Sequence, residues 1–404
     1  MQILYFHQHF STPSGSAGTR SYEMARQLIE AGHQVTMVCG SNVSGKTGLE
    51  MPFINGKRRG IANGIDIIEF DLTYGNRDGF IKRSLTFIAF AWQSSLIAFR
   101  EPTDIVFATT TPLTAGIPGI IAKWFRKKPF VFEVRDLWPE LPKAMGVITN
   151  PFVLYSMRVL EWVSYKSADR LVGLSPGIVD GIAQDVHEKS RIALIPNGCD
   201  LKMFSDKSKF WRPKQTSASD FLAIFAGTHG KANGLGAVVD AAAVLKDRGV
   251  TNIKLVLVGD GAEKPFLAER VQSEALEQIV ILLDQVPKTQ LPGLMASADV
   301  GLQILANIPA FYYGTSPNKF FDYLAAGLPV ITNYPGWVAD LVKEYDCGVS
   351  VPPQDPNAFA DALIQMRNDR DLRQKSLNAR TLGETKFARD KLGEKFVRFI
   401  VEDF

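Results

Sequence analysis

The chain has 404 residues, 46% of them hydrophobic and 22% charged, a composition typical of a globular protein with a sizeable core and about two or three domains. A formal net charge of +3 is small for this length and gives no indication of a nucleic-acid partner. The three cysteines lack metal-ligand spacing, which favours a reducing cytosol over secretion. The first residues have the pattern of a buried strand rather than that of a signal peptide. No apolar run reaches the length of a membrane-spanning helix, about 20 residues.

Short apolar runs alternate with longer helical patterns along the chain. The strand-like runs of the first half are ILYFH, QVTMVC, DIVFAT, PFVFEV and RLVGLS, and those of the second half are FLAIFAGT, IKLVLVGDG, IVILLDQV, DVGLQIL and PVITN. Near-continuous apolar strands separated by helices predict an α/β fold with parallel sheets covered on both faces. The pattern occurs twice, with a polar break at residues 202–220. We therefore expect two Rossmann-like domains, 1–205 and 206–404, with the last helix packing back on the first.

The first Gly-rich turn, STPSGSAG, carries Gly15 and Gly18 where a strand passes into a helix. We expect that helix to run to about Ala31, with Gly32 just beyond its end. Small residues and helix amides at such a turn favour a phosphate group. A tight turn without a ligand fits the residues equally well.

The segment GSNVSGKT, Gly40–Thr47, follows the next strand and matches the P-loop pattern of nucleotide triphosphatases. A P-loop needs a helix that starts at its lysine, but Pro52 follows Lys46 within about a turn and a half and would interrupt it. A polar loop after the strand is the favoured interpretation, and an NTPase or nucleotide-sensing module is the least favoured function.

Two further Gly-rich turns follow strands in the second half. FAGTHGKANGLG contains Gly227 and Lys231, and LVGDGAEK contains Gly259. Turns at the carboxyl ends of parallel strands are the usual location of ligand sites in α/β sheets. We expect these turns to hold a phosphate-bearing ligand. His229 lies in the first of them and can either contact the ligand or face water.

GTSPNKFFDYLAAGLPVI contains a short, well-delimited helix at about residues 317–326, with Ser316 as its N-cap and Gly327 after its end. Lys319 falls in the first turn, where the helix dipole disfavours a cation unless an anion is bound beside it. Asp322 lies three residues on. The pair suits a nucleotide, with the lysine on the diphosphate and the carboxylate on sugar hydroxyls. The alternative is a solvated Lys–Asp pair.

Together these segments, with EVRDLWPE, IPNGCDLKMF, DYLAAGLPV and GVSVPPQDPNAFADAL, resemble the retaining family-four glycosyltransferases of the GT-B fold. YFHQHF, GTRSYEMARQL, EVRDLWPE and GTSPNKFFDYLA resemble most the O-antigen and capsule subgroup, and within it the WbuB-type N-acetyl-L-fucosamine transferases. The resemblance implies two Rossmann-like domains facing a cleft. It also implies transfer of a (deoxy)amino sugar from a uridine diphosphate (UDP) sugar to a polyprenyl-diphosphate-linked sugar.

The resemblance also assigns positions in the second half. The second of the family's paired glutamates falls on Asp322, which would bind the ribose, whereas the first falls on Gly314 and is absent. The family's arginine and lysine fall on Thr228 and Asn233, so Lys231 and Lys319 would take their place at the diphosphate. Amides near Gly15, Gly18, Gly227 and Gly259 would assist them.

In the first half, the family's histidine position is Arg135, followed by Asp136. Arg135 would bind an acceptor pyrophosphate, and Asp136 would orient or deprotonate the acceptor hydroxyl, although a helix or turn cap explains Asp136 equally well. Trp138 and Glu140 belong to the same acceptor-side segment. Retention implies front-face attack without a protein nucleophile. We expect no metal and no cofactor: Asp369 and Asp371 lie on a charged helical face, and His7 and His9 are more often structural.

Residues 80–100, 120–130 and 151–166 mix aromatic, aliphatic and basic side chains. Such surfaces suit the interface of an anionic bilayer, and the alternative is ordinary core helices. We expect peripheral binding to the inner face of the cytoplasmic membrane, with Arg83, Trp92, Trp124 and Lys127 on the lipid side. A UDP-sugar epimerase on the same scaffold is the main alternative function. The donor sugar is not fixed by the sequence.

Overall fold

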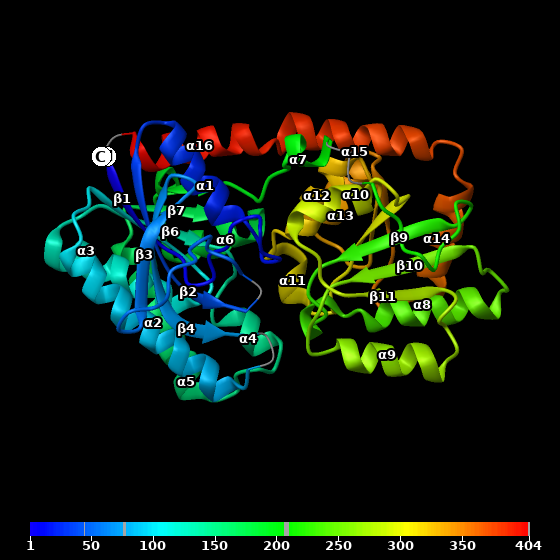
Figure 1. Ribbon diagram of the computed structural model, residues 1–404, viewed down its shortest axis with the longest axis horizontal. Coiled ribbons are helices and arrows are strands. Elements are labelled where there is room, and N and C mark those ends of the chain that lie inside the picture. Colours follow the sequence, from blue (N-terminus) through cyan, green and yellow to red (C-terminus); the bar gives the residue numbers. More distant parts are fainter. Residues whose placement is uncertain (44, 76–77, 206–209, 403–404) are drawn as a thin grey trace. The chain divides into compact units, whose positions relative to one another are not determined.

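The computed structural model describes residues 1–43, 45–75, 78–205 and 210–402, and its helices pack against two largely parallel sheets (Figure 1). The predicted α/β fold with two parallel-sheet domains is confirmed. One compact unit comprises Met1–Pro196, Tyr313–Ser316 and Asp390–Phe404, and the other comprises Asn197–Tyr312 and Pro317–Arg389.

The division between the units falls earlier than the 205/206 boundary that we expected. The backbone N–H of Cys199 donates to the carbonyl of Phe387 at 2.7 Å, and that of Arg389 donates to the carbonyl of Cys199 at 3.0 Å. These bonds hold the segment after Asn197 on the second unit. Part of the expected linker, residues 206–209, lies outside the described residues.

The described part of the first unit contains an eight-stranded sheet in which only the β3–β4 pair is antiparallel. The central strands are mostly apolar and buried along their whole length, as their sequence predicted, and Glu133 of β6 is a charged exception. The β3–β4 hairpin was not predicted, because its first strand, KRRGIA, reads as a polar loop. In sheet order the strands are β3 (Lys57–Ala62), β4 (Ile65–Tyr74), β2 (Gln34–Asn42), β1 (Gln2–Phe6), β5 (Ile105–Thr109), β6 (Phe130–Val134), β7 (Arg170–Gly173) and β8 (Ile192–Leu194).

Helices cover this sheet, and α2, α3 and α5 form a connected layer. The last helix, α16, places Leu392, Phe396 and Ile400 in the same core, where the ring of Phe396 lies 5.2 Å from that of Phe107. The helices are α1 (Arg20–Glu30), α2 (Phe80–Arg100), η1 (Leu113–Gly116), α3 (Ile117–Arg126), α4 (Glu140–Ala144), α5 (Pro151–Ser167), α6 (Pro176–Asp185), η2 (Lys189–Arg191) and α16 (Arg389–Val401).

The described part of the second unit contains a six-stranded sheet whose strands are all parallel. Parallel pairing brings the carboxyl ends of β9, β10 and β12 to one edge of the sheet. In sheet order the strands are β11 (Val280–Leu283), β10 (Ile253–Val258), β9 (Phe221–Ala226), β12 (Val300–Gln303), β13 (Val330–Thr332) and β14 (Gly348–Ser350).

Helices lie on both sides of strands β9 to β11, with α8 and α9 on one side and α12 on the other (Figure 1). No helix within the described ranges is both long and apolar enough to cross a membrane. The helices of this unit are α7 (Leu201–Ser205), η3 (Lys231–Asn233), α8 (Gly236–Asp247), α9 (Lys264–Ser273), η4 (Lys288–Gln290), α10 (Leu291–Met295), α11 (Pro309–Tyr313), α12 (Asn318–Ala326), α13 (Trp337–Glu344), α14 (Pro356–Asn368) and α15 (Leu372–Lys386).

Candidate functional site

Two glycine turns cross at the edge of the second sheet where β9 and β10 end. A Cβ atom at Gly259 would lie 1.8 Å from the carbonyl oxygen of Gly227, and one at Gly261 would lie 2.3 Å from that of His229. Gly259 also has a φ of +152°, which side-chain-bearing residues rarely adopt. These glycines are therefore required by the close approach of the two turns, which sequence reasoning found at Gly227 and Gly259 but missed at Gly261.

Lys319 lies directly over the first of these turns. A Cβ atom at Gly227 would lie 3.2 Å from its Cε. Its ammonium donates to Asn233 Oδ1 at 3.0 Å and lies 4.9 Å from the centre of the Phe225 ring. Tyr323 anchors the helix α12 that carries the lysine, because its hydroxyl contacts the carbonyls of β9 and β12 at 3.1 and 3.2 Å.

The charge of Lys319 has no anionic partner within the described residues. Burial lowers the pKa of Lys319 to about 8, and no nearby carboxylate opposes that effect. A half-buried ammonium with only a neutral amide and an aromatic face beside it favours the arrival of an anion, which would restore the stability of the charged form. Asn233, one of the positions where the resemblance expects a basic residue, therefore positions Lys319.

Lys231 does not join Lys319 in this structure. It lies exposed on η3, and no contact links the two lysines in the part of the chain that is described. Its role at the diphosphate remains a prediction.

Asp322 and Lys319 take separate partners. The carboxylate of Asp322 pairs with Lys288 at 3.3 Å, and both side chains are buried. The solvated Lys–Asp pair considered from the sequence is therefore wrong. Lys288 was missed, since it lies 34 residues away in a loop without any motif. A ribose contact from Asp322 remains a prediction.

The helix of Lys319 begins one residue later than expected, at Asn318. Pro317 occupies the N-cap position without a side-chain hydrogen bond, so the N-cap predicted for Ser316 is wrong. Ser316 belongs to the first unit, along with Tyr313 to Thr315. The end is as predicted, with Gly327 in the left-handed conformation at a φ of 70°.

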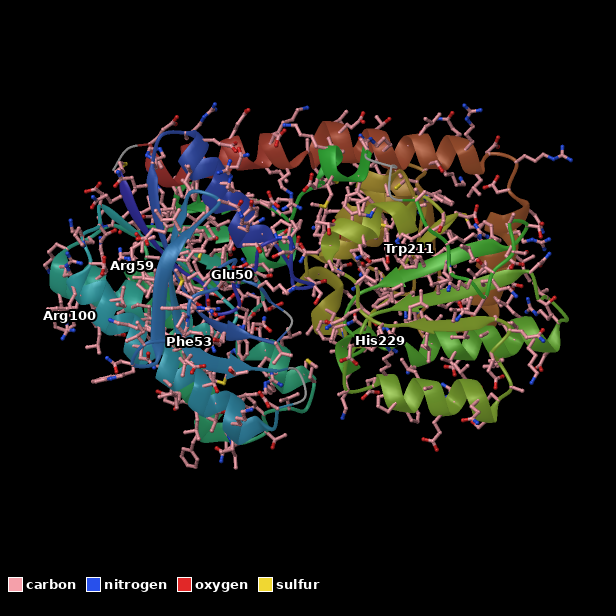
Figure 2. All side chains as sticks on the ribbon, viewed as in Figure 1. Glu50, Phe53, Arg59, Arg100, Trp211 and His229 are labelled. Carbon is pink, nitrogen blue, oxygen red and sulfur yellow. The ribbon has the colours of Figure 1, made fainter. Side chains whose placement is uncertain are left out.

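His229, labelled in Figure 2, is completely buried, so the expectation that it faces water is wrong. Neither ring nitrogen forms a hydrogen bond of normal geometry. Burial and, after it, the charge of Lys264 lower the pKa of His229 to about 4, so the imidazole is neutral near pH 7. Its backbone joins the two glycine turns, because its N–H donates to the carbonyl of Asp260 at 2.9 Å.

In the first unit, Glu133 organises the predicted acceptor side. It is buried at the end of β6 and accepts hydrogen bonds from Arg20 and Thr109, both at 2.8 Å, and from Arg135 at 3.1 Å. Burial raises the pKa of Glu133, but Arg20 and Arg135 outweigh it, so the pKa lies below its ordinary value. Arg135 also donates to Ser21 at 2.7 Å. Sequence reasoning found Arg135 but missed the buried ion pair that holds it.

Asp136 follows Arg135 and accepts a hydrogen bond from the Thr111 hydroxyl at 3.0 Å. Burial raises the pKa of Asp136, with Thr111 and Arg135 acting against that rise. The nearest helix, α4, begins only at Glu140, so Asp136 does not cap it. Trp138 is half-buried, and its indole nitrogen has no hydrogen-bond partner. The acceptor-side roles of these residues remain predictions.

The glycine turn after β1 is less open to a ligand than expected. The N–H of Gly15 donates to the carbonyl of Thr12 at 3.1 Å and is therefore already used, whereas Gly18 is exposed. Helix α1 begins at Arg20, after Thr19. His7 and His9 follow β1. Burial, followed by the charge of Arg135, lowers the pKa of both, to about 3 for His9. In the described ranges, no group of three or more His, Cys, Asp or Glu side chains has an arrangement that would hold a metal ion.

The favoured interpretation of Gly40–Thr47, a loop after the strand without a helix at the lysine, is confirmed, and the P-loop alternative is wrong. Strand β2 continues through Gly40 to Asn42, and no helix starts at Lys46, since the described chain passes into β3 and β4 before α2 begins. Ser44, within the motif, lies outside the described residues.

The predicted lipid-side residues lie at the surface. The side chains of Trp92 and Trp124 are 69% and 53% exposed, Lys127 is exposed, and Arg83 is half-buried. Trp92 and Trp124 are therefore not core side chains, although the same helices also bury Phe90, Ile120 and Tyr165 in the core, as the core-helix alternative expected.

The fold is that of an α/β protein of two parallel-sheet domains, and the second carries a lysine over crossed glycine turns. Residues 15–198 match the family described as glycosyl transferase 4-like domain, and residues 207–380 match that described as glycosyl transferases group 1. The two matches together span most of both units. The chain therefore belongs to the glycosyltransferases that combine a 4-like first domain with a group 1 second domain, and its fold is GT-B.

Curated relatives and solved structures agree with this assignment. The chain is 24% identical over 337 residues to D-inositol 3-phosphate glycosyltransferase of Corynebacterium urealyticum, covering 78% of this chain and 75% of the relative. It is 23% identical over 315 residues to the capsular polysaccharide biosynthesis glycosyltransferase CapM of Staphylococcus aureus, covering 74% and 77%. The structure of Anabaena HepE in complex with UDP and glucose has a TM-score of 0.71 at 17% identity and covers 98% of each chain.

Proposed function

We propose that this glycosyltransferase moves a sugar, with retention of configuration, from a UDP-sugar to a polyprenyl-diphosphate-linked sugar. N-acetyl-L-fucosamine is the proposed donor sugar, and O-antigen or capsule synthesis is the proposed setting. The observation that carries the proposal is the unpaired ammonium of Lys319 above the crossed glycine turns.

Lys319 fits the diphosphate of the donor. A diphosphate carries the negative charge that the lysine lacks. The absence of a side chain at Gly227 lets the stem of Lys319 lie directly over the turn, with its Cε 3.2 Å from where a Cβ atom would be. As the bond from the sugar to the diphosphate breaks, negative charge increases on the leaving oxygen. An ammonium already positioned by Asn233 stabilises that charge without reorganisation. The lysine takes the role of charge neutralisation, and the proposal includes no metal ion.

Arg135 and Asp136 fit the acceptor. Glu133 and Ser21 fix the guanidinium of Arg135, which remains partly exposed and suits a phosphate group of the acceptor. The raised pKa of Asp136 makes its carboxylate a better proton acceptor for the incoming hydroxyl. In front-face attack the leaving phosphate also takes part in removing this proton.

The nature of the sugar rests on relatives and on motifs. CapM acts in capsular polysaccharide biosynthesis by its name, and HepE was crystallised with UDP and glucose. The amino-sugar donor is supported by the subgroup motifs YFHQHF and GTSPNKFFDYLA alone.

A surface on the helices α2, α3 and α5 supports binding to a membrane. Along α2, apolar side chains that are at least 56% exposed recur every three to seven residues: Ile81, Leu85, Ile88, Trp92 and Phe99. Exposed aromatic residues continue this surface on α3 and α5: Trp124, Phe125, Phe152, Tyr155 and Trp162. An apolar helical stripe that stays in contact with water is unfavourable for a protein in solution and favourable in a bilayer interface.

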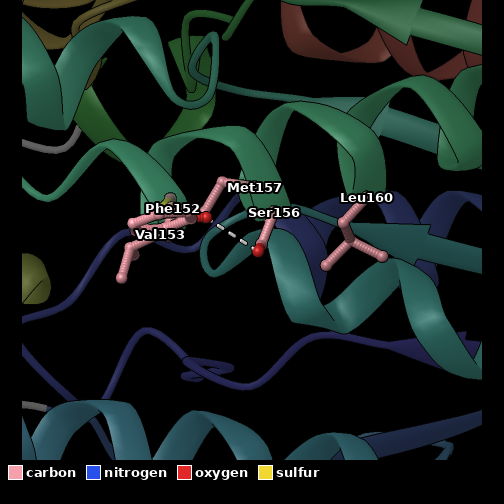
Figure 3. Close-up of a pocket in the computed structure, with 5 residues that line it drawn as sticks. All are labelled: Phe152, Val153, Ser156, Met157 and Leu160. Atoms are coloured by element: carbon pink, nitrogen blue, oxygen red, sulfur yellow. Dashed lines mark hydrogen bonds between the residues drawn. The ribbon is translucent and has the colours of Figure 1, made fainter.

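Figure 3 shows the start of α5, where Phe152, Val153, Ser156, Met157 and Leu160 line a shallow cavity of about 310 Å³. The only hydroxyl among these five side chains, that of Ser156, donates to the carbonyl of Phe152 at 2.8 Å. The cavity therefore offers an apolar surface, which fits the acyl region of lipids. Basic residues near the apolar surface, such as Lys82, Arg100 and Lys127, match anionic headgroups.

The test of the proposed function is release of UDP from UDP-sugars with and without a lipid extract that contains polyprenyl-diphosphate sugars. Release that depends on the lipid and is lost in Lys319→Met supports a transferase. Lys343→Met serves as the matched control, because Lys343 is an exposed lysine of α13. Conversion of the UDP-sugar without any acceptor would instead identify an epimerase and overturn the proposal.

The membrane proposal has a separate test. Trp92→Glu should weaken co-sedimentation with anionic phospholipid vesicles, whereas Leu377→Glu, at an apolar residue 53% exposed on α15, should leave it unchanged. Equal binding of both variants would contradict the assigned surface.

A further inference from the structure

A second cavity lies within the first unit, at the carboxyl ends of β2 and β4. Its volume is about 640 Å³, within the range of small-molecule sites. The loop with the P-loop-like pattern forms one wall, through Gly45 to Gly48, and Phe53 and Glu50 belong to the lining of the same cavity (Figure 2). Neither the family comparisons nor the proposed donor site assigns a role to this cavity.

The walls of the cavity are fixed by one buried carboxylate. Glu69 on β4 is 3% exposed and accepts hydrogen bonds from Ser41 at 3.3 Å, from Thr47 at 2.6 Å and from Arg58 at 2.8 Å. These partners come from β2, from the following loop and from β3. The cavity is therefore preformed rather than a gap between mobile side chains.

The loop is also tied to the glycine turn after β1. The carbonyl of Lys46 accepts hydrogen bonds from the backbone N–H and from the hydroxyl of Thr12, both at 2.8 Å. The backbone N–H of Lys46 donates to the hydroxyl of Ser11 at 3.1 Å. The backbone of Lys46 is thus held in place, while its side chain is exposed.

Three charged side chains of the lining are available to a ligand. Lys46, Glu50 and Asp71 are exposed, and none of them forms an ion pair within the described ranges. Arg58, by contrast, uses its donors inside the protein, on Glu69 and on the carbonyl of Met51 at 3.0 Å. A ligand therefore meets one ammonium donor and two carboxylate acceptors, of which Asp71 lies on β4.

The charge balance argues against a phosphate ligand. Acidic side chains outnumber basic ones in the lining, since Glu50, Glu69 and Asp71 face Lys46 and Arg58. A phosphate would meet this excess of negative charge and an arginine that is already neutralised. A sugar hydroxyl both donates and accepts hydrogen bonds and matches a lysine with an aspartate. Phe53, whose ring has the guanidinium of Arg58 4.4 Å from its centre, adds an apolar side chain to the lining.

We propose that this cavity binds an uncharged saccharide unit through Lys46 and Asp71. Its assignment to the sugar portion of the acceptor rests on the proposed function. The saccharide binding itself does not depend on that assignment.

The test uses N-acetyl-D-glucosamine and N-acetyl-D-galactosamine as probes and saturation-transfer NMR on the intact protein. We expect at least one probe to bind, and we expect Lys46→Ala and Asp71→Ala each to weaken binding about 10-fold, the effect of losing a hydrogen bond to a charged group. Lys57→Ala is the control, because this exposed lysine of β3 lies outside the lining. Circular dichroism and urea unfolding check that each variant folds.

Competition experiments separate this proposal from the donor site. Saccharide binding should persist in the presence of UDP and in the presence of inorganic phosphate. Binding of neither probe, displacement of the probe by phosphate, or unchanged binding in both variants would overturn the proposal. If the saccharide binds as expected but UDP does not bind, the proposed transferase function fails while the saccharide site stands.

Discussion

Replacing Lys319 with methionine should stabilise the free protein and at the same time weaken its response to UDP. Methionine keeps an unbranched apolar stem of similar length but removes the ammonium. The pKa of this lysine falls from the ordinary 10.5 to about 8 because of burial. The difference corresponds to about 3 kcal/mol of unfavourable free energy for the charged form, since one pKa unit equals about 1.4 kcal/mol.

The direction of the pH dependence follows from these values. Between pH 8 and 10.5 the unfolded chain keeps the proton of Lys319 and the folded chain releases it. The free energy of unfolding of the wild type therefore carries the full penalty below about pH 8 and recovers as the pH rises through this window. Near pH 7 we expect Lys319→Met to unfold at higher urea concentration, with a gain of up to about 3 kcal/mol that disappears above pH 10.5.

UDP should stabilise the wild type more than it stabilises Lys319→Met. The diphosphate pairs with the ammonium and stabilises the wild type, whereas Lys319→Met loses a charge-assisted hydrogen bond worth about 1.5–3 kcal/mol, a loss of about 10- to 100-fold in affinity. The assay is urea unfolding with and without UDP, with Lys343→Met as the control. A variant that is less stable than the wild type yet stabilised by UDP to the same extent would refute the reasoning.

Three further predictions concern the same molecule. Asp322→Asn should lower the free energy of unfolding by about 3–5 kcal/mol, because it leaves Lys288 buried without its partner, and the double variant with Lys288→Met should recover most of that loss in urea unfolding. Gly259→Ala should weaken UDP binding and lower the unfolding midpoint, because the added Cβ would lie 1.8 Å from the carbonyl oxygen of Gly227. Trp92→Glu should reduce binding to anionic vesicles and change the free energy of unfolding by less than about 0.5 kcal/mol, since the side chain is 69% exposed.

Each of these predictions has a contradicting outcome. A stable Asp322→Asn variant would show that Lys288 does not need the carboxylate. Wild-type UDP affinity in Gly259→Ala would mean that the crossed turns tolerate a side chain and do not shape the site. Loss of folding in Trp92→Glu would place this tryptophan in the core rather than on a lipid-facing surface.

The fold was predictable because its main signals are local. The apolar runs of the central strands, such as IVFAT and FVFEV, are buried along their whole length and left little choice of structure. Of the strands that were missed, β8 and β14 are short and β3 is polar, whereas β4, IDIIEFDLTY, mixes acidic and apolar residues. KRRGIA at the sheet edge pairs with only one neighbour, so its residues need not be apolar.

The candidate site was predictable only where a motif marks it. Gly227, Gly259 and Lys319 lie in sequence patterns that have a physical reason for each residue. Their partners do not: Asn233 contacts Lys319 across 86 residues, and Lys288 reaches Asp322 from a loop without a motif. Such contacts arise from tertiary packing, which a single sequence does not encode in local spacing.

The P-loop-like pattern, which the sequence does not favour as a phosphate site, shows the opposite case. Gly40–Thr47 satisfies its pattern at every constrained position, but a phosphate site there depends on the helix that follows the lysine. Pro52 and the β-hairpin after it replace that helix. The physical requirement of the motif was more informative than the motif itself.

The most direct test of the central claim is transfer of the sugar itself. Purified protein is mixed with UDP-N-acetyl-L-fucosamine and a polyprenyl-diphosphate-sugar acceptor, and both released UDP and the anomeric configuration of the lipid product are measured. We predict equal amounts of UDP and glycosylated lipid, with the donor's configuration retained and both products lost in Lys319→Met. Undiminished transfer by Lys319→Met, or a product of inverted configuration, would contradict the account.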